Sequence, residues 1–272
     1  IPDHDYGKNG FYHYSIQELA TSVAHQNPRM KGRSLCEIFG AYGWSEGLSM
    51  MKWMADQMMV GGINCFVPHA FTEKEFPDPD CPPHFYAHGY NPQYRYMKIL
   101  FTYMNRVCHL LNGGKAAVDV AILFPAEAEW AGGYRDFGVI GKLCITHQIP
   151  YELAPMDLLE NAQVKKGRII VGQASYRILL VDHIDLLPER VLANLERLSQ
   201  DGGEVWFVGH ASQGLDGGQA SDIRVVQDEE LLPLLQSGAA CICQEEQTWL
   251  RCYKGYHQGM AAYLLANSSM NT

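Results

Sequence analysis

The sequence predicts an α/β fold in two successive parts. In the first part, two short apolar runs, 34–39 and 63–68, alternate with helical patterns, as the strands of a parallel sheet or a β/α barrel do. In the second part, VDVAILFP (118–125) is an unbroken apolar run, which is typical of a parallel strand covered on both faces. Further strands and helices alternate after it, so we expect a flavodoxin-like parallel sheet that ends near residue 240.

The first part is expected to contain helices and one long loop. Ser15 and Glu18 form a capping-box pattern at the start of the first helix. Ser45 opens the second helix, which is rich in methionine and stops at Gly61-Gly62. The segment FTEKEFPDPDCPPHFYAHGYNP has too many prolines for regular structure, and long loops in compact domains are often functional. The helices are expected over residues 15–26, 45–60 and 92–112.

The second part continues with shorter elements and is followed by a different tail. In the tail, WLRCYK and AAYLLAN flank a glycine-containing turn, a pattern that predicts a β-hairpin, which could be the start of a β-domain. Helices are expected over 135–148, 156–162 and 188–200, and strands over 151–154, 168–172, 176–182 and 204–209. The predicted domains are therefore 1–115, 116–240 and 241–272.

Composition excludes several classes of partner. The formal net charge of -9 disfavours nucleic acid, because phosphate binding needs clustered Lys and Arg. No apolar run reaches the roughly 18 residues of a membrane span, so no membrane partner is expected. After 118–125 there is neither GxGxxG nor a P-loop, and LVDHID (180–185) offers no nucleophile. We therefore expect no cofactor and read the second part as non-catalytic, with roles in packing and association.

The eight cysteines show no CxxC pair and lie mostly in apolar contexts. We interpret most of them as buried free thiols, which fits a reducing compartment. The compartment stays open, although the bacterial cytoplasm is favoured. His84 and His88 have a metal-like spacing but lack a clear third ligand, so no metal site is expected.

Polar and aromatic side chains follow both strands of the first part. Glu37 lies near the end of 34–39 and is followed by Tyr42 and Trp44, whereas 63–68 leads into His69 and Phe71. In β/α barrels the active site lies at the carboxyl ends of the strands. Sugars present CH faces to aromatic rings and hydroxyls to charged groups, so this set predicts a sugar-binding cleft.

Each of these residues also has a simpler interpretation. Glu37 could pair with an arginine, His69 could hold a loop, and Trp44 could pack the start of its helix. Glycoside hydrolysis normally needs two carboxylates, and Glu37 is the one strong candidate. Glu46 is expected to open a helix and to favour its dipole. The weaker carboxylates are Asp3, Asp5, Glu46, Asp56, Glu73 and Glu75.

Several motifs together resemble a group of large bacterial glycoside hydrolases. CEIFGAYGW, SEGLSMMKWMADQ, GGINCFVPHAF and DPDCPPHFY resemble the barrel of the α-L-rhamnosidase type, glycoside hydrolase family 106 and its relatives. The order of a barrel followed by a flavodoxin-like domain is similar to family 42 β-galactosidases. The resemblance covers about residues 30–240 and rests chiefly on the first motif.

The resemblance implies that 34–39 and 63–68 are the last two strands of a (β/α)8-type barrel. It implies that Glu37 is the nucleophile or the water-activating base, with Tyr42, Trp44, His69 and Phe71 binding the substrate. The acid partner would lie upstream. A barrel needs about 250 residues, whereas about 115 precede the second part. The chain is therefore expected to be a fragment of a glycosidase, inactive when isolated, with the second carboxylate absent.

A non-catalytic carbohydrate-binding or oligomerisation module is the alternative to this function. The expected partner is a carbohydrate substrate in the first interpretation, and a homo-oligomer is possible in both. Nucleotide binding at the α/β sheet is weakened by the missing glycine fingerprint.

Overall fold

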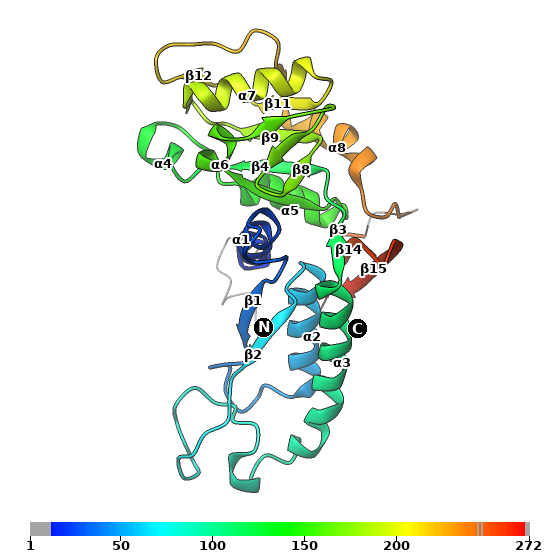
Figure 1. The fold of residues 1–272 in the computed structure, drawn as a ribbon. Coiled ribbons are helices and arrows are strands. Elements are labelled where there is room, and N and C mark those ends of the chain that lie inside the picture. The colour runs from blue at the N-terminus through cyan, green and yellow to red at the C-terminus, as the bar shows by residue number, and fades with distance from the viewer. Residues whose placement is uncertain (1–11, 244, 246, 270–272) are drawn as a thin grey trace.

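Two parallel strands backed by two long helices form the first part of the protein. The computed structural model describes residues 12–243, 245 and 247–269. Helices α2 and α3 run side by side and cover one face of the β1–β2 pair (Figure 1). The elements of this part are α1 (Tyr12–Gln26), β1 (Leu35–Ile38), α2 (Leu48–Val60), β2 (Cys65–Pro68), the short 3-10 helix η2 (Ala87–Gly89) and α3 (Tyr94–Asn112).

Methionines and aromatic rings fill the space between these helices and strands. Met51, Met54 and Met59 of α2 are buried together with Met97 and Met104 of α3. Flexible thioether side chains fill an irregular gap well, which explains why this helix pair is rich in methionine. The methionines of both helices therefore serve as core residues.

The second part is a parallel sheet with helices on both faces. Its strand order is β13-β11-β9-β4-β5, which corresponds to 2-1-3-4-5 in chain order and is the flavodoxin-like arrangement. This part contains β4 (Val120–Phe124), α4 (Ala128–Ala131), α5 (Gly138–Thr146), β5 (Tyr151–Pro155), α6 (Met156–Glu160), β9 (Ile178–Asp182), α7 (Glu189–Gln200), β11 (Glu204–Val208), β13 (Arg224–Val226), α8 (Asp228–Leu235) and the 3-10 helix η3 (Gln236–Gly238).

The unbroken apolar run of β4 is explained by burial on both sides. Ala121 and Leu123 point into the core shared with α6 and α7. Val120 and Ile122 point into the opposite core, shared with α5 and α8. Because strand side chains alternate between faces, both sets must be apolar when helices cover both faces.

Several short strands lie outside this sheet. The run 168–172 was expected as a strand, but it forms the middle of a small antiparallel sheet, where each of its two neighbours is only two or three residues long. Such pairings depend on which chain segment lies alongside, a property that an apolar run does not encode. These strands are β6 (Gln163–Val164), β7 (Ile169–Val171), β8 (Ala174–Tyr176), β10 (Leu186–Leu187) and β12 (Gln213–Gly214).

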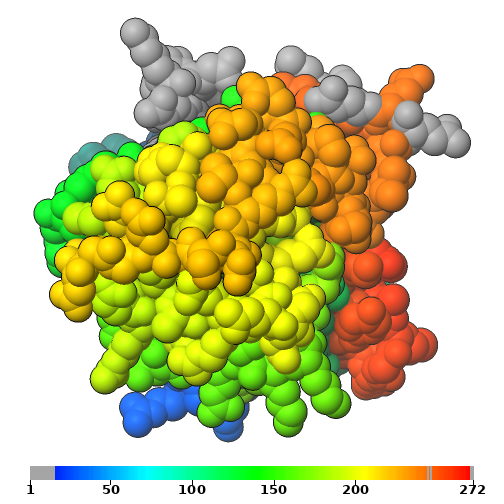
Figure 2. Space-filling model, turned by 90° about the horizontal axis from the view of Figure 1, so that it is seen from above, coloured from blue at the N-terminus to red at the C-terminus, as the bar shows by residue number. Residues whose placement is uncertain are grey.

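The tail returns to the junction between the two parts. Strands β14 (Leu250–His257) and β15 (Met260–Asn267) pair antiparallel, and β14 also pairs with β3 (Gly114–Ala116). The hairpin thereby contacts α2 and α3, and it projects beside the parallel sheet and its helices (Figure 2). None of the helices in the described residues combines the length and apolar character needed to cross a membrane.

Helix α1 joins the first part to the edge of the parallel sheet. At Leu153 in edge strand β5, the backbone N–H donates to Ser22 Oγ over 2.8 Å, and the carbonyl accepts from Gln26 Nε2 over 2.7 Å. Gln26 Nε2 also donates to Tyr176 Oη at 2.9 Å. The helix therefore satisfies backbone groups that an uncovered edge would leave unpaired. Because α1 begins at Tyr12, Ser15 lies inside the helix and the predicted cap at Ser15 is wrong.

The cysteines are less buried than expected. Cys144 is buried, whereas Cys65 and Cys81 are exposed and the other five are half-buried. Cys65 is exposed because the face of β2 on which it lies is open. All eight are free thiols.

Removing the Gln26 side chain should destabilise the protein. In Gln26→Ala the buried Leu153 carbonyl loses its donor, and a buried polar group without a partner costs about 1–3 kcal/mol. We expect a loss of that size in the unfolding free energy, measured by urea denaturation with far-UV circular dichroism. Arg29→Ala, in the exposed turn after α1, is the control and should change stability by less than about 0.5 kcal/mol. Equal midpoints for the two variants would contradict the role assigned to α1.

Candidate active site at the carboxyl ends of β1 and β2

Glu37 lies on the open face of a two-stranded parallel sheet. In the register of β1 and β2, Glu37 is opposite Val67. Ile38 on the other face is buried in the core formed with α2 and α3. Because side chains alternate along a strand, Glu37 points away from that core and is exposed, next to the exposed Leu35. Within the described residues Glu37 makes no ion pair with an arginine.

A pocket of about 410 Å³ runs along β1 between α1 and α2. It brings together three of the predicted site residues: Glu37, Tyr42 and His69. The thiol of Cys81 lies at the same pocket, and its pKa is raised, mainly by Asp80 and to a lesser extent by Glu37. A carboxylate, a phenol and an imidazole around a largely apolar pocket suit a polar ligand with apolar faces. The apolar lining comes from Ile16, Ala20, Leu35, Ile38, Phe39, Trp53, Met54, Met58 and Ile63.

His69 sits where the two strands end. Its backbone N–H donates to the Ile38 carbonyl over 2.8 Å, which ties the end of β2 to the end of β1. The ring packs so closely on Gly40 that a Cβ there would come within 3.1 Å of the imidazole Cγ. The Nδ1 atom is buried and has no hydrogen-bond partner in the described residues. The ring is therefore placed by backbone contacts, and no hydrogen bond from Nδ1 holds a loop.

Trp44 and Phe71 do not line the pocket, although each follows a pocket residue, Tyr42 or His69, by two positions along the chain. The Trp44 ring contacts Phe76 edge-on at 5.7 Å and the His84 ring at 6.0 Å, so it packs on the long loop. Phe71 is 64% exposed and meets Phe85 at 5.4 Å. The predicted set thus divides into pocket residues and rim residues. We name Trp44 and Phe71 the rim.

Glu46 is a buried carboxylate that the sequence-based interpretation missed. Its side chain is 4% exposed, and neither carboxylate oxygen has a hydrogen-bond partner in the described residues. Burial raises the pKa of Glu46 to about 7. The expected helix-opening role is wrong, because α2 begins at Leu48 and Gly47 is its N-cap. The sequence contains one indication that α2 begins after Glu46, because Gly47 is itself an acceptable N-cap residue.

The remaining carboxylates have other surroundings. Asp56 is half-buried and accepts a hydrogen bond from Tyr103 Oη over 2.7 Å. Burial, reinforced by Asp56, holds the pKa of Tyr103 above its usual range. Glu73 and Glu75 are exposed. Asp3 and Asp5 lie outside the described residues.

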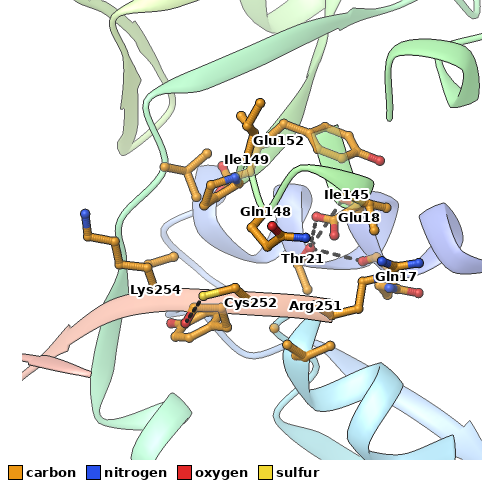
Figure 3. A pocket seen from close by; sticks show the side chains of 18 of the residues that line it. Gln17, Glu18, Thr21, Ile145, Gln148, Ile149, Glu152, Arg251, Cys252 and Lys254 are labelled. Carbon is orange, nitrogen blue, oxygen red and sulfur yellow. Dashed lines mark hydrogen bonds between the residues drawn. The ribbon is translucent and has the colours of Figure 1, made fainter. Parts of the chain in front are cut away.

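A second pocket lies where α1, α2, the start of β5 and β14 meet (Figure 3). Glu18, Thr21 and Arg251 point toward it, and Thr21 Oγ1 donates to the Gln17 carbonyl over 3.1 Å. Burial and the nearby Glu152 hold the pKa of Glu18 well above its ordinary value. The volume of this pocket is about 70 Å³, against about 410 Å³ for the pocket along β1. The larger pocket, along β1, is therefore the substrate candidate.

A charged network occupies the carboxyl edge of the parallel sheet, where doubly wound folds commonly bind ligands. Arg135 Nε lies 2.9 Å from Asp182 Oδ2, and Arg135 Nη1 lies 2.7 Å from Asp228 Oδ2. His183 Nδ1 lies 2.9 Å from Asp182 Oδ1. Burial raises the pKa of Asp182, whereas the hydrogen bond from Arg135 lowers that of Asp228. The charges of Arg135, Asp182 and Asp228 thus pair with one another across the loops.

Glu46 should make the protein less stable as the pH rises toward neutrality. Its pKa rises from an ordinary 4.5 to about 7 on folding, so the folded state binds this proton more tightly than the unfolded chain. Between those two values, each increase in pH therefore reduces the unfolding free energy. From pH 5 to pH 8 the Glu46→Gln variant should gain about 1–3 kcal/mol of stability relative to the parent, measured by urea denaturation.

Glu73→Gln is the matched control, because the same chemical change there removes an exposed carboxylate. Its stability difference from the parent should stay constant over this pH range. If Glu46→Gln also keeps a constant difference, the carboxylate of Glu46 is not held in a desolvated site.

Comparisons with known proteins agree with the fold and with the predicted resemblance. The chain is similar over 92% of its length to the rhamnosidase from Novosphingobium sp. PP1Y, with a TM-score of 0.65 and 14% identity, and it covers 27% of that chain. It is similar over 74% of its length to the cold-adapted β-galactosidase from Rahnella sp. R3, with a TM-score of 0.52 and 14% identity, covering 30% of that chain. It therefore spans less than a third of each.

At these identities the two structures establish the shared fold alone. No curated protein matches the sequence. The profile of the alpha-L-rhamnosidase family, glycoside hydrolase family 106, matches residues 9–227, which is most of the chain. The predicted resemblance to glycoside hydrolases is thereby confirmed, and the chain belongs to the alpha-L-rhamnosidase family, glycoside hydrolase family 106.

Proposed function

We propose that the protein acts in the hydrolysis of α-L-rhamnosyl bonds by a two-carboxylate mechanism, with Glu37 as one of the two carboxylates. The observation that carries this proposal is the position of Glu37. It is a glutamate on the open face of β1, at a pocket that also holds Tyr42 and His69. Family membership supports the class of reaction, and the position of Glu37 at the pocket supports its choice as a catalytic carboxylate.

In this proposal β1 and β2 are the last two strands of a (β/α) barrel. The strands are parallel, and α2 and α3 cover the face that carries Ile38, as the outer helices of a barrel do. The opposite face, with Leu35, Glu37 and Val67, would then line the barrel interior. The corresponding domains are 1–115 for the barrel portion, 116–240 for a non-catalytic flavodoxin-like unit and 241–272 for the hairpin segment. The second carboxylate would come from a barrel strand that this chain does not contain.

The two groups of predicted residues take different parts in substrate binding. Tyr42 and His69 lie in the pocket and would contact the sugar whose bond is cleaved. Trp44 and Phe71 offer exposed ring faces at the rim, where the CH faces of a sugar can pack. Glu37 acts on the anomeric carbon directly as nucleophile or through water as base, and the distance to the acid partner sets the stereochemistry.

Replacing Glu37 should abolish most of the activity of the full-length enzyme. Glu37→Gln removes a carboxylate that the mechanism needs while keeping the size of the side chain. We expect kcat on an aryl α-L-rhamnoside to fall by about 10³-fold or more with an unchanged thermal unfolding midpoint. Glu75→Gln, an exposed glutamate in the long loop, should retain activity within about twofold of the parent. Near-normal activity of Glu37→Gln would refute its catalytic role.

The purified 272-residue chain should show no turnover of the same substrate. A single carboxylate cannot both protonate the leaving group and stabilise or hydrate the anomeric carbon. The measurement is release of the aryl alcohol at high protein concentration, with the full-length enzyme as the positive control. Robust hydrolysis by the isolated chain would show that both catalytic groups lie within it.

A further inference from the structure

The segment between β2 and α3 displays a set of aromatic rings on its outer surface. Tyr90 is 66% exposed, and Tyr86, Tyr94 and Phe76 are also more than a third exposed. Between residues 71 and 96, every large apolar side chain that is exposed is aromatic, and none is aliphatic. We name Phe76, Tyr86, Tyr90 and Tyr94 the aromatic platform.

The aromatic platform is continuous with the rim of the candidate active site. Phe76 stacks on Tyr90 with ring centroids 4.3 Å apart and planes 13° from parallel, and it also meets Trp44 of the rim. Tyr86 meets Tyr94 at 5.0 Å, and Tyr94 lies 6.2 Å from Phe71 of the rim. Two rows of rings therefore lead outward from the two rim residues.

Buried polar contacts inside the loop hold this surface in place. Asp78 is 4% exposed and accepts a hydrogen bond from Thr72 Oγ1 over 2.6 Å. The rings of His84 and His88 are hydrogen-bonded to backbone carbonyls of the same loop. His84 Nε2 lies 2.8 Å from the Asp80 carbonyl oxygen, and His88 Nε2 lies 2.8 Å from the Lys74 carbonyl oxygen. A loop fixed in this way loses little conformational entropy when a ligand binds to it.

The chemistry of the surface favours a carbohydrate. The exposed apolar side chains of residues 71–96 are aromatic rings and prolines, and this segment contains no Leu, Ile, Val or Met. The exposed charges here are Glu73, Glu75 and Asp80 against Lys74 and Arg95, an acidic balance that disfavours phosphate chains. Tyrosine offers a flat apolar face and a hydroxyl, which suits the CH face and the hydroxyl rim of a pyranose.

We propose that the aromatic platform binds the sugar units adjacent to the one held in the pocket, so that the enzyme's substrate class is oligosaccharides and polysaccharides. This inference rests on the proposed function, because the pocket along β1 must hold the reacting sugar. A chain that enters the pocket passes over Trp44 and Phe71 and continues on the platform rings. The platform thus selects long substrates without contacting the bond that is cleaved.

The test compares a long and a short substrate in the full-length enzyme. The probes are a rhamnose-terminated pentasaccharide and methyl α-L-rhamnoside. Tyr90→Ala and Tyr86→Ala should each lower kcat/KM on the pentasaccharide about three- to tenfold and leave kcat/KM on the methyl glycoside unchanged. Tyr90→Phe keeps the ring and should retain most of the parent value. Tyr96→Ala is the matched control, because Tyr96 is an exposed tyrosine of α3 that packs under Arg95.

Equal losses on both substrates, or no loss on either, would overturn the platform proposal. Pentasaccharide binding to the 272-residue chain, measured by isothermal titration calorimetry, separates the two hypotheses. If the full-length enzyme cleaves no rhamnoside, the proposed function fails. Binding that weakens in Tyr90→Ala and persists in Tyr96→Ala would then still support the platform, and absence of binding would refute it.

Discussion

The arrangement of the protein depends on how helix α1 covers the free edge of the parallel sheet. Strand β5 ends the sheet, and at Leu153 both backbone hydrogen-bonding groups are satisfied by side chains of α1. The chain then leaves α1 and enters β1 within a few residues, where Asn64 bonds to the Ser34 N–H and to the Gly32 carbonyl. The contact between α1 and β5 therefore helps to fix the position of β1 and of the candidate active site. Without α1, the backbone N–H and carbonyl of Leu153 would be unpaired, and the segment that leads into β1 would not be anchored to the sheet.

Two glutamates close in sequence show how differently a carboxylate can be used. Glu37 is exposed on an open sheet face, where it can meet a substrate or a second carboxylate. Glu46 is buried without a partner, and burial raises its pKa to about 7. A charged group in that position is costly, so Glu46 favours its neutral form over part of the physiological range. Glu37 therefore remains the candidate for chemistry, and Glu46 makes stability depend on pH.

The long loop after β2 combines two opposite surfaces. Its inner side is polar, with Asp78 and His84 buried among hydrogen bonds, and its outer side is aromatic. Prolines lack a backbone N–H, so a proline-rich segment cannot be held by the backbone hydrogen bonds of a helix or sheet. Hydrogen bonds from side chains within the loop hold it instead. At the carboxyl edge of the parallel sheet, where doubly wound folds commonly bind ligands, Arg135 pairs with Asp182 and Asp228. The pocket along β1 and the aromatic platform, the two candidate binding surfaces, both lie in the first part of the chain.

The sequence by itself determined the features that repeat along the chain. The doubly covered strand β4, the methionine-rich α2 and the alternation of strands and helices in the second part all follow from apolar periodicity and glycine stops. The motif around Glu37 indicated the family as well. Tertiary structure alone decided the docking of α1 on β5, the pairing of β14 with β3, and the antiparallel place of β7. It also decided the start of α2 at Leu48, and hence the burial of Glu46, and it left Cys65 exposed. The physical reason is that periodicity records the faces of one element, whereas edges, burial and pairing depend on which distant segment arrives beside it.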